Sequence, residues 1–314
     1  MRILTNVKID WLRWRWHSLV VSWVVILAGI GLMATRGLPL GIDFSGGTLI
    51  VTRFATPVTE DQIRNAIAGD AESVQRYSDA PNEFSIRLPL HEGAEAANET
   101  ALAETAQRLV GELKQANIGQ FEVLSTEFVG PVIGEDLQRK GLYATIASLV
   151  GIMIYIALRF RFSFGVGAMV ASIHDVLITL SVLTLTGYEL SLNTIAAILT
   201  LVGYGVNDQI VIFDRVRENL RIRKREPIET VINTAVNQTL PRTVITAGTT
   251  FLAVLSLFVF GGQVLKGFAF TMLVGIVTST YSTVFIASAI AVMLSPKTRI
   301  PVKQTQSKAG RQAS

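Results

Sequence analysis

The chain has 314 residues, of which 50% are hydrophobic, and a formal net charge of +4. Together with a mean hydropathy of +0.44, this composition excludes an ordinary soluble domain and indicates a protein that crosses a membrane several times. The lack of cysteine excludes a disulfide framework and a thiolate metal site. The sequence contains no GxxxxGK[ST] motif, so it gives no sign of ATP hydrolysis.

The first apolar stretch covers residues 18–35 and follows a basic segment. It has no small-residue cleavage site and ends at Thr35 and Arg36. We therefore interpret it as a retained membrane anchor rather than a signal peptide. This gives a cytoplasmic N-terminus at residues 1–17 and a transmembrane helix at residues 18–36.

Residues 37–138 are polar and show a β-α-β-β-α-β pattern. A strand is expected at 48–55. A helix running to residue 68 should start after Thr59, because Thr59 and Gln62 have the spacing of a capping box. The order of elements predicts a ferredoxin-like α+β domain. Its other expected elements are strands at 72–77, 84–90 and 121–128, and a helix from the Asn98 cap to 116.

Five further apolar stretches predict transmembrane helices at 141–158, 164–186, 190–213, 243–260 and 267–294. The fold class is thus an all-α bundle of six transmembrane helices with an inserted α+β domain. Spans two to six occupy residues 139–295. The link at 215–241 has apolar residues at helical spacing, which predicts an amphipathic helix along the inner membrane interface. Residues 296–314 are polar and are expected to form a disordered cytoplasmic tail.

The distribution of charge predicts the orientation. Residues 37–138 hold 16 acidic and 6 basic residues, whereas the basic residues of the remaining chain gather beside the ends of spans. Four basic clusters fall on one side of a six-span arrangement: before the first span, between spans two and three, after span four and after span six. The positive-inside rule makes that side cytoplasmic. Both termini are therefore expected inside the cell, and the α+β domain outside.

An acidic residue, Asp208, lies within the fourth span. It is 18 residues from Leu190 at the outer end, and Arg242 is 18 residues from Phe260 at the outer end of the fifth span. At 1.5 Å per residue, both side chains lie about 27 Å from the outer side, at matching depth. This placement predicts an ion pair that offsets the cost of burying either charge.

Polar residues accompany these charges. Thr200, Tyr204 and Asn207 lie near Asp208 on the fourth span and favour a hydrogen-bonded water path for ions. Polar stripes on the last three spans are expected to face one another, because facing lipid is costly. The other interpretation is that the ion pair only locks helix packing.

The third span carries a second acidic residue, Asp175, next to His174. Ser172 and Thr179 share its helical face. Asp175 is a candidate member of the ion path, or a structural group that hydrogen-bonds a neighbouring helix.

Six segments together resemble the SecF members of the SecD/SecF protein-export family: GIDFSGGT (41–48), EFVGPVIGEDL (127–137), HDVLITL (174–180), GYGVNDQIVIFDRVREN (203–219), TLPRTVITAGTT (239–250) and GFAFTMLVGI (267–276). The resemblance implies half of an RND-type fold, completed by a SecD partner. It further implies association with SecYEG and YajC, unfolded proteins as cargo, and use of the proton motive force in the bacterial inner membrane. The family's functional aspartate and arginine correspond to Asp208 and Arg242.

The GIDFSGGT segment shows no catalytic chemistry. Gly41, Gly46 and Gly47 are expected to permit a tight passage from helix to strand, and Asp43 to be structural. No enzyme activity, cofactor, metal site or nucleic-acid partner is predicted. Two rival functions remain: a structural membrane anchor without ion coupling, and half of an RND-type exporter of small molecules or lipids. The choice between H⁺ and Na⁺ is left open.

Overall fold

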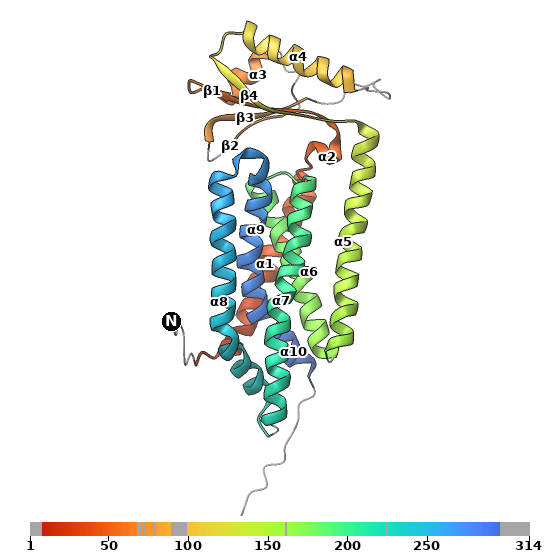
Figure 1. The fold of residues 1–314 in the computed structure, drawn as a ribbon, viewed down its shortest axis with the longest axis vertical. Helices are drawn as coiled ribbons and strands as arrows, with labels where there is room; N and C mark the ends of the chain where they lie inside the picture. Colours follow the sequence, from red (N-terminus) through yellow and green to blue (C-terminus); the bar gives the residue numbers. More distant parts are fainter. Residues whose placement is uncertain are drawn as a thin grey trace, which may run out of the picture.

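The structure, a computed structural model, describes residues 8–67, 71, 73–77, 80–88, 99–160, 162–223 and 225–295. The expected tail at 296–314 and the Asn98 cap lie outside the described residues. The molecule consists of a long helix bundle with a small domain across one end (Figure 1).

The end domain has the predicted order of elements. The capping box is confirmed, because Thr59 Oγ1 accepts a hydrogen bond from the backbone of Gln62 and Gln62 Oε1 accepts one from the backbone of Thr59. A four-residue helix within the GIDFSGGT segment was not predicted. The elements are α2 (Ile42–Ser45), β1 (Gly47–Phe54), α3 (Glu60–Ala66), β2 (Ser73–Tyr77), β3 (Ala80–Leu88), α4 (Glu99–Gln115) and β4 (Phe121–Val129).

The four strands form an antiparallel sheet in the order β2-β3-β1-β4. This order and the α3 and α4 crossovers are those of a ferredoxin-like fold, which confirms the predicted fold class. Ile50, Phe54 and Phe84 point to the helix side, where they pack with Leu109 and Leu113 in the domain's core. The other face of the sheet is turned toward the helix bundle (Figure 1).

Within the described ranges, six helices are long and apolar enough to cross a membrane, as predicted. The N-terminal one begins with the 3-10 turn η1 (Trp11–Trp14), and the last one contains a π-helical turn, η2 (Thr283–Ala287), that was not predicted. The helical elements are α1 (Arg15–Arg36), α5 (Pro131–Arg159), α6 (Phe162–Thr186), α7 (Leu192–Ile222), α8 (Ile228–Phe260), α9 (Gly262–Ser282) and α10 (Ser288–Leu294).

The link predicted at 215–241 does not form a separate helix. Helix α7 continues to Ile222, and α8 starts at Ile228 and runs through the fifth span, with Pro241 inside it. The apolar stripe of the link is fully buried against α7 and the C-terminal elements instead of facing lipid. The sequence period located the apolar face correctly, but protein covers that face. The residues concerned are Val231, Ile232, Ala235 and Val236.

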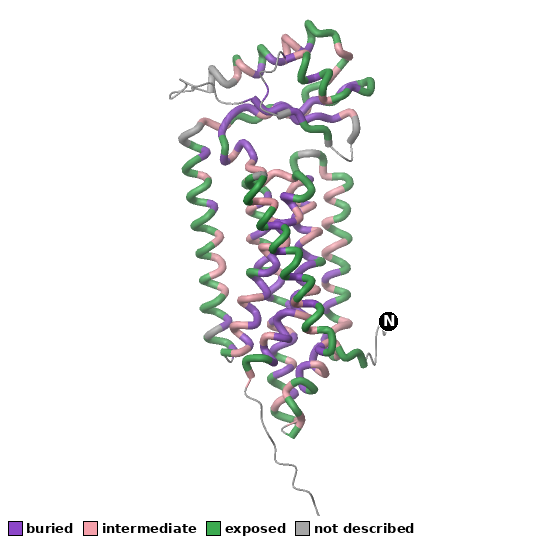
Figure 2. Tube along the Cα trace, turned by 180° about the vertical axis from the view of Figure 1, so that it is seen from behind, coloured by how far each residue is buried: buried purple, intermediate pink, exposed green. Residues whose placement is uncertain are grey.

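Burial is concentrated in the central helices. Helices α6, α7 and α9 are buried along much of their length, whereas α5 and α8 are largely exposed (Figure 2). An apolar surface on a spanning helix is expected to face lipid. Most of the buried polar residues of the bundle are found on these central helices.

Candidate functional site

Asp208 lies on the buried side of α7, where 4% of its surface is exposed. The adjacent Gln209 is buried as well, whereas Asn207 is exposed. Among the described residues, no hydrogen bond or ion pair to its carboxylate is found. Burying a charged carboxylate without a direct partner is costly.

The predicted ion pair between Asp208 and Arg242 is not formed. The guanidinium attracts the carboxylate through space, but Arg242 lies on the exposed face of α8. The count of residues along each helix predicts the depth of a side chain. It does not predict the direction in which the helix turns it.

The polar stripes form two separate surfaces and do not all face one another, as had been expected. Thr200 and Asn207 on α7 and Arg242, Thr249 and Ser256 on α8 are exposed. On the last span, by contrast, several polar residues are buried inside the bundle, among them Thr271, Thr278, Ser279 and Ser282.

Tyr204 lies between these two surfaces. The residue is half-buried on α7, and its hydroxyl is buried. It lies close enough to Asp208 to interact with it electrostatically, and Thr250 on α8 is also near. Tyr204 therefore connects the buried acid to the exposed α7–α8 face.

Asp175 is held more tightly than Asp208. It is 2% exposed, and its Oδ1 lies 3.0 Å from His174 Nδ1. Ser282 on α9 donates a hydrogen bond of 2.8 Å to Oδ2. Gly205 lets α7 approach this group, since a Cβ there would lie 2.3 Å from Ser279 Oγ and 3.6 Å from Asp175 Oδ2. The site thus joins α6, α7 and α9.

Residues that the sequence did not indicate extend this site to the first helix. His174 stacks on Tyr281, with ring centroids 6.2 Å apart. The Tyr281 hydroxyl donates to the backbone oxygen of Ser18 at 2.8 Å. Gln209 is 1% exposed and its amide has no partner among the described residues. A single tyrosine or glutamine in an apolar segment produces no periodic pattern in the sequence. Only its position on the same helical face as a buried acidic residue could have identified it as part of the site.

Two glycines of the GIDFSGGT segment have positive φ values, which favour glycine. Gly46 and Gly47 have φ values of 73° and 116°. A Cβ on Gly47 would lie 2.6 Å from the backbone oxygen of Leu88. Gly41 has an extended backbone, and its N–H donates to the backbone oxygen of Leu190 at 2.8 Å.

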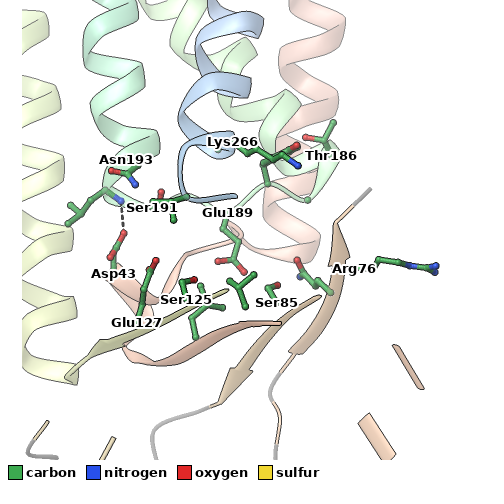
Figure 3. A pocket seen from close by; sticks show the side chains of 18 of the residues that line it. Asp43, Arg76, Ser85, Ser125, Glu127, Thr186, Glu189, Ser191, Asn193 and Lys266 are labelled. Atoms are coloured by element: carbon green, nitrogen blue, oxygen red, sulfur yellow. Dashed lines mark hydrogen bonds between the residues drawn. The ribbon is translucent and has the colours of Figure 1, made fainter. Parts of the chain in front are cut away.

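Asp43 reaches from α2 to the start of α7. Its Oδ2 accepts a hydrogen bond of 2.7 Å from the backbone N–H of Leu192 (Figure 3). A carboxylate at the first turn of a helix is favoured, because the free N–H groups and the helix dipole attract negative charge. Asp43 is therefore a fastening between the end domain and a spanning helix.

A cavity of about 540 Å³ separates the sheet from the adjacent ends of the helices (Figure 3). Carboxylates from both sides line it, among them Asp43, Glu127 and Glu189. Burial and, second, the charge of Asp43 raise the pKa of Glu127 above its ordinary value. Within the described ranges, no group of three or more histidine or acidic side chains is arranged to hold a metal ion.

Comparison with known proteins shows the family. Residues 110–297 match the family "Protein export membrane protein SecD/SecF, C-terminal", and residues 31–58 match the SecD/SecF GG motif. "Protein translocase subunit SecF" of Desulfurispirillum indicum is 40% identical, over 92% of this chain and 92% of its own. The chain belongs to the SecF family. The SecF of Escherichia coli O157:H7 is 36% identical, over 96% of this chain and 92% of its own.

A solved structure shares the fold. The crystal structure of SecDF, a translocon-associated membrane protein from Thermus thermophilus, has a TM-score of 0.81 to this chain at 33% identity. The match covers 93% of this chain and 39% of the SecDF chain. The C-terminal SecD/SecF match includes Asp175, Asp208 and Arg242, and the GG-motif match includes Asp43.

Proposed function

We propose that this chain is a non-enzymatic subunit of the Sec translocase that promotes the export of unfolded proteins across the bacterial inner membrane. Its membership of the SecF family carries this proposal, because the relatives are named as protein translocase subunits. SecYEG and YajC are the further partners that family resemblance suggests. The basic residues at the end of the bundle opposite the α+β domain support cytoplasmic termini and an external domain.

The energy source in this proposal is the proton motive force, and Asp208 is the group that takes up and releases the ion. A charged aspartate in a spanning helix costs about 2.5–3.5 kcal/mol on insertion scales. No described residue offsets this cost by a direct bond to Asp208. Tyr204, Thr200 and Asn207 lead from this carboxylate to the exposed α7–α8 face, and Arg242 lies on that face. Asp175 is a second candidate on the path.

The exposed polar stripe on α7 and α8 supports a SecD partner. Thr200, Asn207, Arg242, Thr249 and Ser256 would be poorly placed against lipid, and a second polar helix surface covers them at lower cost. The matched SecDF chain is much longer than this one. We assign its remaining part, SecD, to this face, which would complete an RND-type arrangement of which this chain is half.

The two rival functions do not account for both the buried Asp208 and the exposed polar stripe on α7 and α8. The described part of the external domain is one small α+β unit, whereas an exporter of small molecules or lipids needs a larger funnel. A purely structural role has one observation in its favour: the hydrogen bonds of Asp175 to His174 and Ser282 hold helices together. That observation concerns Asp175, and Asp208 has no such bonds among the described residues.

The decisive experiment compares Asp208→Asn with the native chain, each reconstituted with SecD in proteoliposomes. Asparagine keeps the volume and removes titration, so we expect normal assembly but loss of ion flux and of gradient-stimulated export. Asp214→Asn is the matched control, because Asp214 lies on the same helix but is exposed and paired with Arg159 at 3.1 Å. Full gradient stimulation by Asp208→Asn would refute the ion-handling role, and failure to assemble would indicate a structural one.

A further inference from the structure

The loop between α6 and α7 is the place where the external domain is fastened to the helix bundle. Leu190 N–H donates to the backbone oxygen of Pro39 at 2.6 Å, and Gly41 N–H donates to the backbone oxygen of Leu190 at 2.8 Å. These bonds form a short parallel bridge between residues 39–41 and the loop. The side chain of Asp43 adds its bond to Leu192 N–H.

Arg87 makes a second fastening from the sheet. It lies on β3, 9% exposed, and its Nη2 donates both to Glu189 Oε2 and to the backbone oxygen of Leu40, each at 2.8 Å. One guanidinium therefore holds the loop and the 39–43 segment together. We call residues 187–192, residues 39–43 and Arg87 the outer strap.

The position of the outer strap in the chain is what gives it significance. Helix α6 carries Asp175 and helix α7 carries Asp208, and the two helices are joined by this loop. Asp208 is 16 residues from Leu192 and Asp175 is 11 residues from Thr186, which correspond to about 24 Å and about 16 Å along the helix axes. A shift or rotation of either helix at its acidic residue reaches the loop, because a helix moves as a rigid element.

Because a cavity lies beneath the sheet, the outer strap provides much of the contact between the sheet and the helix bundle in this area. Leu49, Val51 and Ser85 on the sheet line one side of this space of about 540 Å³, and the outer ends of the helices line the other (Figure 3). The sheet is not packed against the helices over this area. Besides the covalent connections, a further contact is made by Gln138 on α5, which donates to the backbone oxygen of Phe44.

We infer that the outer strap transmits movements of α6 and α7 to the external domain, with Asp43 and Arg87 as its positioning residues. This inference rests on the proposed function, since it supplies the mechanical step between ion binding and work on the exported chain. In this proposal the hydrogen bonds of the outer strap remain formed while the helices move. The strap therefore transmits the movement and does not need to open. Weakening it should leave the ion path intact and disconnect it from export.

The test uses the full chain with SecD in proteoliposomes and measures ion flux and gradient-stimulated export separately. Asp43→Ala and Arg87→Gln should keep native flux and lose export stimulation about tenfold, within the 5–150-fold range typical of coupled sites. Asp43→Asn keeps an acceptor oxygen and should retain most of the stimulation. Asp136→Ala is the matched control, since Asp136 is exposed on α5 and pairs only with Lys140 in the described structure.

A rescue experiment follows from the lack of native cysteine. Leu40 and Leu190 are bridge partners, so Leu40→Cys with Leu190→Cys places two thiols within reach of a disulfide. Added to Asp43→Ala, the oxidised pair should restore export stimulation, and a reductant should remove it again.

The results separate the two proposals. Retention of both flux and stimulation by Asp43→Ala and Arg87→Gln overturns the inference. Loss of both flux and stimulation also overturns it, because the residues would then maintain the bundle itself. A disulfide that forms and blocks export in the otherwise native chain would show a latch that must open. If Asp208→Asn keeps native flux, the proposed function fails whatever the strap variants do.

Discussion

Asp175 and Asp208 lie on neighbouring helices and differ in what surrounds the carboxylate. Asp175 has a histidine at 3.0 Å and a serine hydroxyl at 2.8 Å, both from well-packed positions. Asp208 is also buried, and no described residue bonds its carboxylate directly, although the charge of Arg242 acts on it. Direct bonds hold a charged state in place, so the less supported carboxylate is the better candidate for repeated protonation and release.

At the cavity, Glu127→Gln should change how stability depends on pH. The pKa of Glu127 is raised by burial and by Asp43, so the folded protein binds this proton more tightly than the unfolded chain does. The resulting stabilisation is present at pH below the ordinary value of 4.5 and is lost as pH rises through the raised pKa. The variant lacks this loss and should gain stability relative to the native chain as pH rises.

Thermal unfolding of the detergent-solubilised protein, from about pH 4 to about pH 8, measures this effect. Glu122→Gln, on the same strand but not among the residues that line the cavity, is the control for removal of a carboxylate. Parallel stability curves for Glu127→Gln and the native chain would contradict the prediction.

Among the secondary-structure elements, those with a strong period or a cap signal were predictable. The six spanning helices and the α3 capping box followed from apolar runs and from Thr59 with Gln62. Helix α2 was missed because its four residues are too few to show a period. The π-helical turn η2 was missed because its residues read as ordinary helix.

Gly47→Ala should destabilise the junction of α2 and β1. A positive φ costs an alanine about 1–2 kcal/mol, and the new Cβ would also press on the backbone oxygen of Leu88. Gly111→Ala is a control of opposite sign in the same domain, because nothing lies within 4 Å of its Cβ position on α4. Alanine within a helix is favoured over glycine by about 0.5–1 kcal/mol. Hydrogen exchange of the external domain in the full chain measures both, and equal protection in the two variants would argue against a strained junction.

For the molecule as a whole, the sequence predicted how the parts are ordered but not how the bundle is closed. The ferredoxin-like order of strands followed from the alternation of elements. The rotation of each helix did not follow, and this is why Asp208 and Arg242 were wrongly paired. Rotation is set by close contacts such as Gly205 against Ser279, which involve residues from distant parts of the chain.

The proposed orientation can be tested with single cysteines, since the native chain has none. Gln115→Cys on the external domain should react with an impermeant maleimide in cells whose outer membrane is permeabilised. Thr230→Cys near the start of α8 should react only after the inner membrane is opened. Both positions are exposed, so burial does not limit labelling. Labelling of Thr230→Cys in intact inner membranes would reverse the assigned topology.

The exposed stripe on α7 and α8 also bears on the period between synthesis and assembly. On the proposed function, the acid group of the ion route is enclosed by this chain, while the basic group and the polar residues beside it await a second polypeptide. A newly inserted subunit therefore holds only one wall of the conduit. An unassembled subunit would therefore not conduct ions, and it would not dissipate the proton gradient before its partner binds.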